Sequence, residues 1–164
     1  NPEEARILTE KVRPDEAADT LSSWMLWLSN HQDSARRTAV MGWCFGGGWA
    51  LKAATLSPAE AAVVYYGRVT LPATELARLK GPVLGHFATR DTFITRDMVA
   101  GFEQAMNQAG KPYQVYWYEA DHAFANPTGN TFDRDDAQLA WRRSLDFLKA
   151  QLGGAALGNN QNRG

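Results

Sequence analysis

Short apolar runs alternate with amphipathic segments along most of this chain. Four short runs, each closed by glycine, proline or polar residues, predict buried strands. Between them, apolar residues recur every three or four positions, which is typical of helices that bury one face. The predicted strands are 38–41, 61–66, 82–88 and 113–118, and the predicted helices are 14–31, 49–56, 95–109 and 133–152.

This alternation predicts an α/β fold, in which a mostly parallel sheet is covered by helices on both faces. A short helix or loop at 72–80 and a polar loop at 119–130 complete the pattern. A length of 164 residues suits one domain with a real core. We therefore predict a single α/β domain over 1–152 and a flexible tail over 153–164, which has little to bury.

Composition and charge exclude several classes of partner. Apolar residues make up 45% of the chain and charged residues 21%, which is ordinary for a globular protein. The net charge of −1 comes without a basic or acidic block, so we expect no nucleic-acid partner. No apolar run approaches the roughly 18 residues of a membrane span. The chain begins with Asn1 rather than methionine and shows no signal peptide, so we expect that N-terminal sequence is missing.

Cys44 is the only cysteine, so an intrachain disulfide and a cysteine-rich zinc site are both excluded. We expect neither a metal nor a cofactor. A chain without disulfides fits the reducing cytoplasm, which is the location we expect. A lone cysteine is more often a small buried hydrophobe than a nucleophile, so its neighbours must decide between the two.

Those neighbours fit a nucleophile elbow. The stretch Gly42-Trp43-Cys44-Phe45-Gly46 matches the pattern G-x-S-x-G with cysteine in place of serine, between a predicted strand and a predicted helix. Glycines leave room beside the sharp turn, and the helix N-terminus lowers the thiol pKa. We expect the Phe45 N–H to donate to an oxyanion. A glycine-rich turn around an inert, buried cysteine is the alternative.

Asp91 is the candidate acid of this site. It follows directly on a predicted strand, where this kind of sheet places its triad acid. A turn or cap aspartate is the alternative. Asp97 falls inside the first turn of the next helix, and Asp121 is adjacent to His122, where bonding to the ring is awkward. Both are weaker candidates.

His122 is the candidate base. It lies in the loop after the last strand, and it completes the order nucleophile, acid, histidine of the α/β hydrolases. A solvated loop histidine is the alternative. His31 closes the first helix, which is an ordinary surface position for a cation. His86 lies within a strand, so we expect it in the core or the sheet.

At this point the chain resembles the dienelactone hydrolases, which are carboxymethylenebutenolidase-like α/β-hydrolases with a cysteine nucleophile. The resemblance runs from about residue 15 to 152. It implies a triad of Cys44, Asp91 and His122, and hydrolysis of a small ester or lactone through an acyl-cysteine. The motifs that carry it are Gly42 to Gly48, Val64-Tyr65-Tyr66-Gly67, Arg90-Asp91, Asp121 to Pro127 and Ala140-Trp141.

Two departures from the family pattern are visible. The family sheet has about twice the four strands predicted here, so we expect that its N-terminal half, with the second oxyanion N–H, is missing from this sequence. Four residues after the histidine, the family places an arginine that binds the substrate carboxylate, whereas this chain has Asn126. Asparagine lacks the charge and forked donors of arginine. Arg68 is a candidate replacement, and a solvated loop charge is the alternative.

Aromatic residues near the motifs are candidates for the substrate pocket, although core packing explains aromatics equally well. Two other functions stay open. A non-catalytic fragment would need a partner chain or self-association to cover its sheet. A redox sensor would use the lone thiol, which has no resolving partner within the chain. The candidate pocket residues are Trp43, Tyr66, Arg68 and Phe124.

Overall fold

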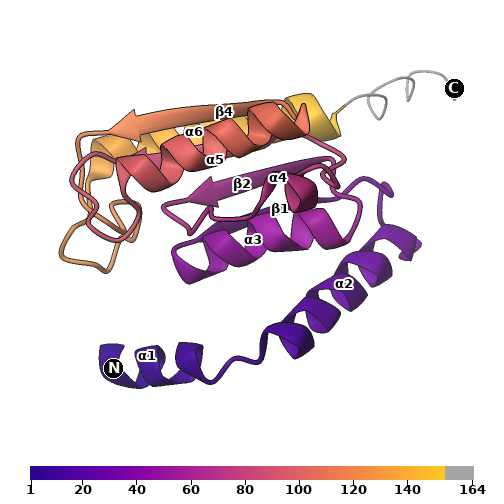
Figure 1. Ribbon diagram of the computed structural model, residues 1–164, viewed down its shortest axis with the longest axis horizontal. Helices are drawn as coiled ribbons and strands as arrows, with labels where there is room; N and C mark the ends of the chain where they lie inside the picture. The colour runs from indigo at the N-terminus through magenta and orange to yellow at the C-terminus, as the bar shows by residue number, and fades with distance from the viewer. Residues whose placement is uncertain (154–164) are drawn as a thin grey trace, which may run out of the picture.

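The computed structural model of this protein describes residues 1–153 (Figure 1). The described residues form four strands and six helices, and strands alternate with helices from β1 onward. The elements are α1 (Pro2–Glu10), α2 (Pro14–Asn30), β1 (Ala39–Trp43), α3 (Phe45–Leu56), β2 (Ala61–Tyr65), α4 (Ala73–Leu76), β3 (Val83–Ala88), α5 (Arg96–Ala109), β4 (Tyr113–Tyr118) and α6 (Arg134–Leu152).

The four strands form one parallel sheet in the order β1-β2-β3-β4. Parallel neighbours need a crossover, and each crossover here contains a helix. The register pairs Gly42 with Val64 and Tyr65 with His86, so the carboxyl ends of the central strands reach the same edge. The α/β class predicted from the alternation of patterns is therefore confirmed.

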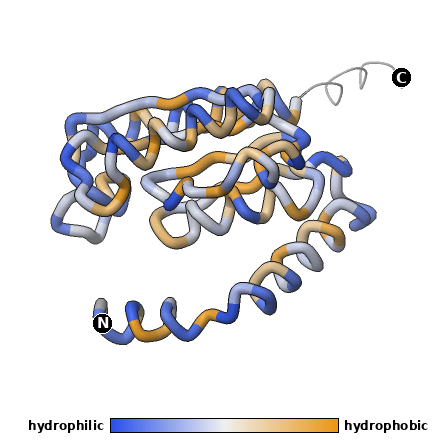
Figure 2. The backbone as a smooth tube through the Cα atoms, in the orientation of Figure 1, coloured by the Kyte–Doolittle hydropathy of each residue, from blue (hydrophilic) through white to orange (hydrophobic). Residues whose placement is uncertain are grey.

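Two apolar clusters fill the space on the two faces of the sheet. Successive side chains of a strand point to opposite faces, so Val64 and Phe87 belong to one cluster and Val63 and Leu84 to the other. The first cluster packs under α3, α4 and α5, and the second under α6. The apolar colouring of the central strands is visible in Figure 2. The elements that carry the candidate site are thus held by a core on each side.

Helix α3 begins at Phe45, four residues earlier than predicted. Three consecutive glycines weaken helix propensity, and the prediction therefore placed the start after them. In the structure this glycine-rich turn is helical because it packs on the end of β2: a Cβ on Gly47 would lie 3.0 Å from the Tyr65 carbonyl oxygen. Close packing overrides propensity here, and it brings the helix N-terminus directly to Cys44.

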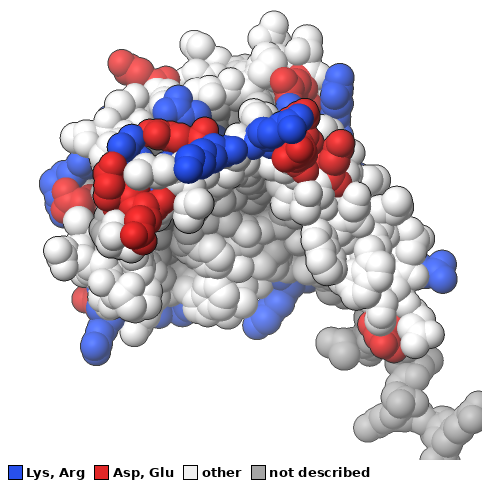
Figure 3. Space-filling view, turned by 90° about the horizontal axis from the view of Figure 1, so that it is seen from below, with Lys and Arg blue, Asp and Glu red and all other residues white. Residues whose placement is uncertain are grey.

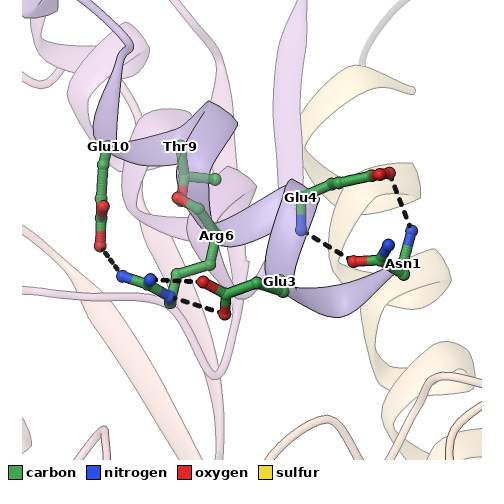
Figure 4. A network of polar contacts seen from close by, with 6 residues as sticks. All are labelled: Asn1, Glu3, Glu4, Arg6, Thr9 and Glu10. Carbon is green, nitrogen blue, oxygen red and sulfur yellow. Dashed lines mark hydrogen bonds and ion pairs between the residues drawn. The ribbon is translucent and has the colours of Figure 1, made fainter.

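Helix α1 was not predicted; Ile7 and Leu8 are its only large apolar residues, and both are exposed. Its first turn is a capping box, in which the Asn1 side chain accepts from the Glu4 N–H at 2.9 Å and the Glu4 carboxylate reaches back to Asn1. Arg6 pairs with Glu3 at 2.7 Å and with a second glutamate one turn on (Figure 4). Local polar contacts, rather than burial, favour this helix.

Helix α2 buries less than its pattern predicts. Met25 is its one buried residue, whereas Trp24 is 63% exposed and Leu28 43% exposed. Seen from below, positive and negative side chains are interspersed, and a broad uncharged surface lies beside them (Figure 3). The outer part of the predicted tail, 154–164, lies outside the described residues. Within the described part, no helix is long and apolar enough to span a bilayer.

Candidate active site

Cys44 lies at a sharp turn between β1 and α3. Its backbone has φ 51° and ψ −120°, a conformation that side-chain-bearing residues rarely adopt. The turn brings Gly42 so close to the first helical turn that a Cβ would lie 2.1 Å from the Gly46 carbonyl oxygen. The Cys44 N–H donates to the Tyr65 carbonyl at 2.9 Å, which ties the turn to β2. The strained conformation of an elbow is therefore present at the cysteine.

We expected both glycines that flank Cys44 to make room for the turn, but only Gly42 does so. A Cβ built on Gly46 meets no atom within 4 Å, whereas one on Gly42 collides with the backbone. The steric requirement therefore falls on the residue two positions before Cys44. The glycine two positions after it faces open space in the first turn of α3.

The three candidate triad residues meet at the carboxyl edge of the sheet. Nε2 of His122 lies 3.2 Å from Sγ of Cys44, and Nδ1 lies 2.6 Å from Oδ2 of Asp91. The other Asp91 oxygen accepts from the backbone N–H groups of Phe93 at 2.8 Å and Ile94 at 3.0 Å. The imidazole is therefore bonded at both nitrogens, and the carboxylate that orients it is itself held by the loop after β3.

The loop that carries His122 is held by local bonds and ring contacts. The His122 carbonyl accepts from the Thr131 hydroxyl at 2.7 Å, and Ala123, the next residue, has a positive φ of 63°. The imidazole lies edge-on to Tyr66 at 5.2 Å and to Phe93 at 5.3 Å, measured between ring centroids. These contacts fix the ring plane and leave Nε2 directed at the sulfur.

The pKa values of the cysteine and the histidine move in opposite directions. The hydrogen bond from His122 lowers the pKa of the Cys44 thiol, and the backbone N–H of Phe45 acts in the same direction. The bond to Cys44, reinforced by Asp91, raises the pKa of His122 to about 8. Partial burial opposes both shifts, because it disfavours charge. Each shift favours the ion pair of a thiolate and an imidazolium.

The weaker acid candidates lie elsewhere. Asp121 pairs with Arg90 at 3.3 Å on the exposed surface, and Asp97 sits in the first turn of α5. His31 caps the C-terminal end of α2. The predicted core placement of His86 is confirmed: its side chain is fully buried, and burial lowers its pKa to about 3.

His86 belongs to a buried polar chain beneath the site. Nδ1 lies 2.8 Å from the Tyr118 hydroxyl and Nε2 lies 2.9 Å from the Ser144 hydroxyl. Ser144 donates to the Ala140 carbonyl at 2.9 Å, so it accepts from the imidazole and from Tyr65, whose hydroxyl lies at 2.7 Å. These partners satisfy a neutral imidazole that carries its proton on Nε2, and they join β2 and β3 to α6.

Two hollows adjoin Cys44. The first, here the Trp141 hollow, has a volume of about 480 Å³, and the second, here the Arg68 hollow, about 850 Å³. Cys44 and Tyr66 line both. The Trp141 hollow is also lined by Trp43, Tyr65, Ala123, Ala125, Asn126, Pro127, Ala137 and Trp141. The Arg68 hollow is also lined by Phe45, Gly48, Trp49, Lys52, Arg68, Thr70, Leu71, Phe93, Ile94 and His122.

Three of the four predicted pocket residues line these hollows, namely Trp43, Tyr66 and Arg68. Phe124 does not: its ring is fully buried against Tyr66, with centroids 5.4 Å apart, and it supports the wall from behind. The sequence places Phe124 near the histidine, but it does not show which way the ring points.

Sequence reasoning missed other lining residues. Phe93 follows Asp91 by only two positions, so its closeness to the candidate acid could have been predicted from the sequence. Trp141 belongs to the Ala140-Trp141 motif, but that motif did not indicate that α6 would bring its side chain to the site. Asn126, noted for its spacing from the histidine, lines the Trp141 hollow, and its side-chain oxygen accepts from the Thr128 N–H at 3.2 Å.

Comparison with known proteins bears on this site. The model of the dienelactone hydrolase family matches residues 1–152. The chain belongs to the dienelactone hydrolase family. A carboxymethylenebutenolidase of Pseudomonas sp. (strain P51) is 34% identical over 112 residues, covering 68% of this chain and 47% of that protein. A Bradyrhizobium protein named as a probable 2-oxo-3-(5-oxofuran-2-ylidene)propanoate lactonase is 28% identical, over 94% of this chain and 67% of its own length.

Solved structures share the fold of this family member. The dienelactone hydrolase-like promiscuous phosphotriesterase from metagenomic libraries superposes with a TM-score of 0.79 at 17% identity, over 90% of this chain and 66% of its own. An esterase of Thermogutta terrifontis gives 0.64 at 19% identity, over 87% and 66%. The chain thus spans between about half and two thirds of the family proteins it matches. Within residues 1–153, no group of three or more acidic, histidine or cysteine side chains is placed to hold a metal ion.

Proposed function

We propose that this protein hydrolyses a carboxylic ester or lactone through Cys44, His122 and Asp91. One observation carries the proposal: the sulfur, the imidazole and the carboxylate form an unbroken hydrogen-bonded chain, with bonds of 3.2 and 2.6 Å, at the mouth of two hollows. Membership of the dienelactone hydrolase family supports the same reaction class.

The first half of the reaction forms an acyl-enzyme. His122 holds the proton of Cys44, and the thiolate attacks the carbonyl carbon of the substrate. The carbonyl oxygen becomes an oxyanion, which the Phe45 N–H at the start of α3 stabilises. The imidazolium then gives its proton to the leaving oxygen as the bond between carbon and that oxygen breaks. The products of this half are the alcohol and a thioester on Cys44.

The second half releases the acid. His122, now neutral, takes a proton from a water molecule, and the hydroxide attacks the thioester carbon. The tetrahedral intermediate collapses, the sulfur leaves as a thiolate, and His122 is again protonated. Asp91 remains ionised and stabilises the imidazolium in both halves. In a lactone the leaving oxygen stays attached to the acyl chain, and one hydroxy acid is the product.

A non-catalytic chain that needs a partner is the second candidate. The observation that favours it is the span of the family alignments, since the chain covers 47% of the Pseudomonas carboxymethylenebutenolidase. In that case the triad would be formed, but Phe45 would be its sole oxyanion donor until another chain supplied a second.

The test is hydrolysis of p-nitrophenyl acetate by the chain and by two variants, Cys44→Ser and Cys44→Ala, with folding checked by circular dichroism. We expect turnover by the chain and its loss in Cys44→Ala by at least about a thousandfold. Turnover that is equal in Cys44→Ala would contradict the proposal. A folded chain without turnover, whose activity returns on adding a partner chain, would favour the second candidate.

A further inference from the structure

We propose that the two hollows at Cys44 divide the substrate, so that the acyl group lies in the Trp141 hollow and the leaving alcohol in the Arg68 hollow. This assignment rests on the proposed acyl transfer at Cys44. It makes Trp141 and Leu71 residues that determine specificity for opposite ends of one ester.

The division follows from what each substituent of the reacting carbon requires. The tetrahedral intermediate carries the sulfur, the oxyanion, the leaving oxygen and the acyl chain. The oxyanion needs a hydrogen-bond donor, and the leaving oxygen needs a proton from Nε2 of the histidine. The acyl chain requires neither. Its place is therefore the hollow that the proposed proton donor and oxyanion donor do not line.

The two hollows differ in this respect. His122 and Phe45, the proton donor and the oxyanion donor, both line the Arg68 hollow. Neither lines the Trp141 hollow, although Cys44 lines both. A leaving group directed into the Trp141 hollow would lie in a space that neither the His122 imidazole nor Phe45 lines. The opposite orientation brings the leaving oxygen within reach of the imidazolium.

The walls of the Trp141 hollow indicate the class of acid. Trp43 stacks on Tyr65, with ring centroids 5.3 Å apart and planes 29° apart, and Trp141 faces the same space from α6. Small residues such as Ala123 and Ala137 also line this hollow, and Asn126 adds one polar side chain to the wall. Flat aromatic faces beside small side chains favour a flat apolar acyl group, such as that of an aromatic or unsaturated acid.

The Arg68 hollow fits the alcohol. Apart from Arg68 and Lys52 its wall is largely apolar, with Trp49, Leu71 and Ile94 among its members. Lys52 is paired with Glu75, which removes its charge from competition for a ligand. The larger volume, about 850 Å³ against about 480 Å³, accommodates a bulkier group than the acyl side does. We infer an apolar alcohol or phenol as leaving group.

The test separates the two ends with two ester series. In the acyl series, p-nitrophenyl acetate is compared with p-nitrophenyl benzoate, which share a leaving group. In the alcohol series, phenyl acetate is compared with 1-naphthyl acetate, which share an acyl group. The variants are Trp141→Ala and Leu71→Ala. Their matched controls are Trp24→Ala and Leu26→Ala, which remove exposed side chains of α2, 63% and 65% exposed.

We expect Trp141→Ala to lower the benzoate-to-acetate ratio of kcat/KM about tenfold and to leave the naphthyl-to-phenyl ratio unchanged. Leu71→Ala should change the naphthyl-to-phenyl ratio several-fold. It should leave the deacylation rate, measured after the burst of p-nitrophenol, as in the unmodified chain, because the alcohol has departed by then. The two controls should change neither ratio.

Two results would overturn the division. One is the reversed pattern, in which Trp141→Ala alters the alcohol series and Leu71→Ala the acyl series. The other is a Trp141→Ala variant indistinguishable from Trp24→Ala. In both cases a burst that depends on Cys44 would show that the acyl-enzyme mechanism stands. Failure of the mechanism itself would be seen separately, as undiminished turnover in Cys44→Ala.

Discussion

The sulfur of Cys44 lies 3.2 Å from Nε2 of His122, although 78 positions separate the two residues. The parallel sheet explains this proximity. Cys44 follows β1 and His122 follows β4, and parallel strands bring their carboxyl ends to one edge. The consequence is mutual: each residue shifts the pKa of the other toward the charged form. Four predictions follow from this and from neighbouring contacts.

The first prediction concerns the reactivity of the thiol. Replacing His122 with alanine removes the largest influence that lowers the pKa of Cys44. The pH midpoint of alkylation by iodoacetamide should therefore rise toward the ordinary thiol value of about 8.5. The Phe45 N–H is retained in the variant, so a part of the lowering should persist. Because Cys44 is the only cysteine, the total thiol signal reports on it alone.

His31→Ala is the matched control for that experiment, since it removes a histidine at the end of α2. Its alkylation profile should coincide with that of the unmodified chain. A profile for His122→Ala that also coincides would show that the two side chains are uncoupled in solution.

The second prediction concerns Asp91. In Asp91→Asn the side-chain oxygen can still accept from the Phe93 and Ile94 N–H groups, so the fold should survive. The amide would present a neutral group to Nδ1 of His122, which loses its orientation and its counter-charge. Esterase activity should fall about a thousandfold or more. Asp121→Asn, which removes an exposed partner of Arg90, should retain activity within about twofold. Equal losses in both variants would refute the role of Asp91.

The third prediction compares two glycines of the elbow by thermal unfolding. Gly42→Ala places a methyl group 2.1 Å from the Gly46 carbonyl oxygen and should destabilise the fold by about 3 kcal/mol or more. Gly46→Ala meets open space within a helix and should be neutral or stabilising by up to about 1 kcal/mol. If both substitutions cost the same free energy of unfolding, the close approach at Gly42 would be disproved.

The fourth prediction concerns stability in acid. Burial lowers the pKa of His86 to about 3, from the ordinary histidine value of 6.5. The unfolded chain therefore binds a proton below pH 6.5 that the native chain cannot bind until about pH 3, so stability falls as the pH falls through this window. Between pH 7 and pH 5 this group should remove about 2 kcal/mol from the free energy of unfolding.

Urea unfolding of His86→Gln and of the unmodified chain at both pH values measures the effect, and the variant should lack this part of the loss. His31→Gln is the control, since its side chain is 35% exposed. That variant should lose as much stability between pH 7 and pH 5 as the unmodified chain. A His86→Gln variant with an unchanged pH dependence would mean that solvent reaches His86 in the folded state.

Periodicity alone located most of the fold. The strands at 61–66, 82–88 and 113–118 were predicted to within one residue at each end, because continuous apolar runs are typical of parallel strands buried on both faces. The errors fell where local signals conflict with packing. The glycines after Cys44 concealed the start of α3, and the apolar residues of α2 predicted a buried face that is largely exposed.

The sequence predicted which three residues make up the candidate site, but it did not predict the side chains and hollows around them. Cys44, Asp91 and His122 each follow a strand, and chain order alone places such residues at one edge of a parallel sheet. The distances between them, the hollows beside them and the inward turn of Phe124 depend on how helices pack across that edge.

The sequence by itself determined the alternation of strands and helices, the elbow at Cys44 and the chain order of the three candidate triad residues, because these depend on local periodicity and on parallel connection. Only the tertiary structure decided that Trp141 of α6 and Phe93 of the loop after β3 line the two hollows at Cys44, and that His86 is neutral beneath the site. The physical reason is that burial and contact between distant segments arise from packing in three dimensions, which no local pattern encodes.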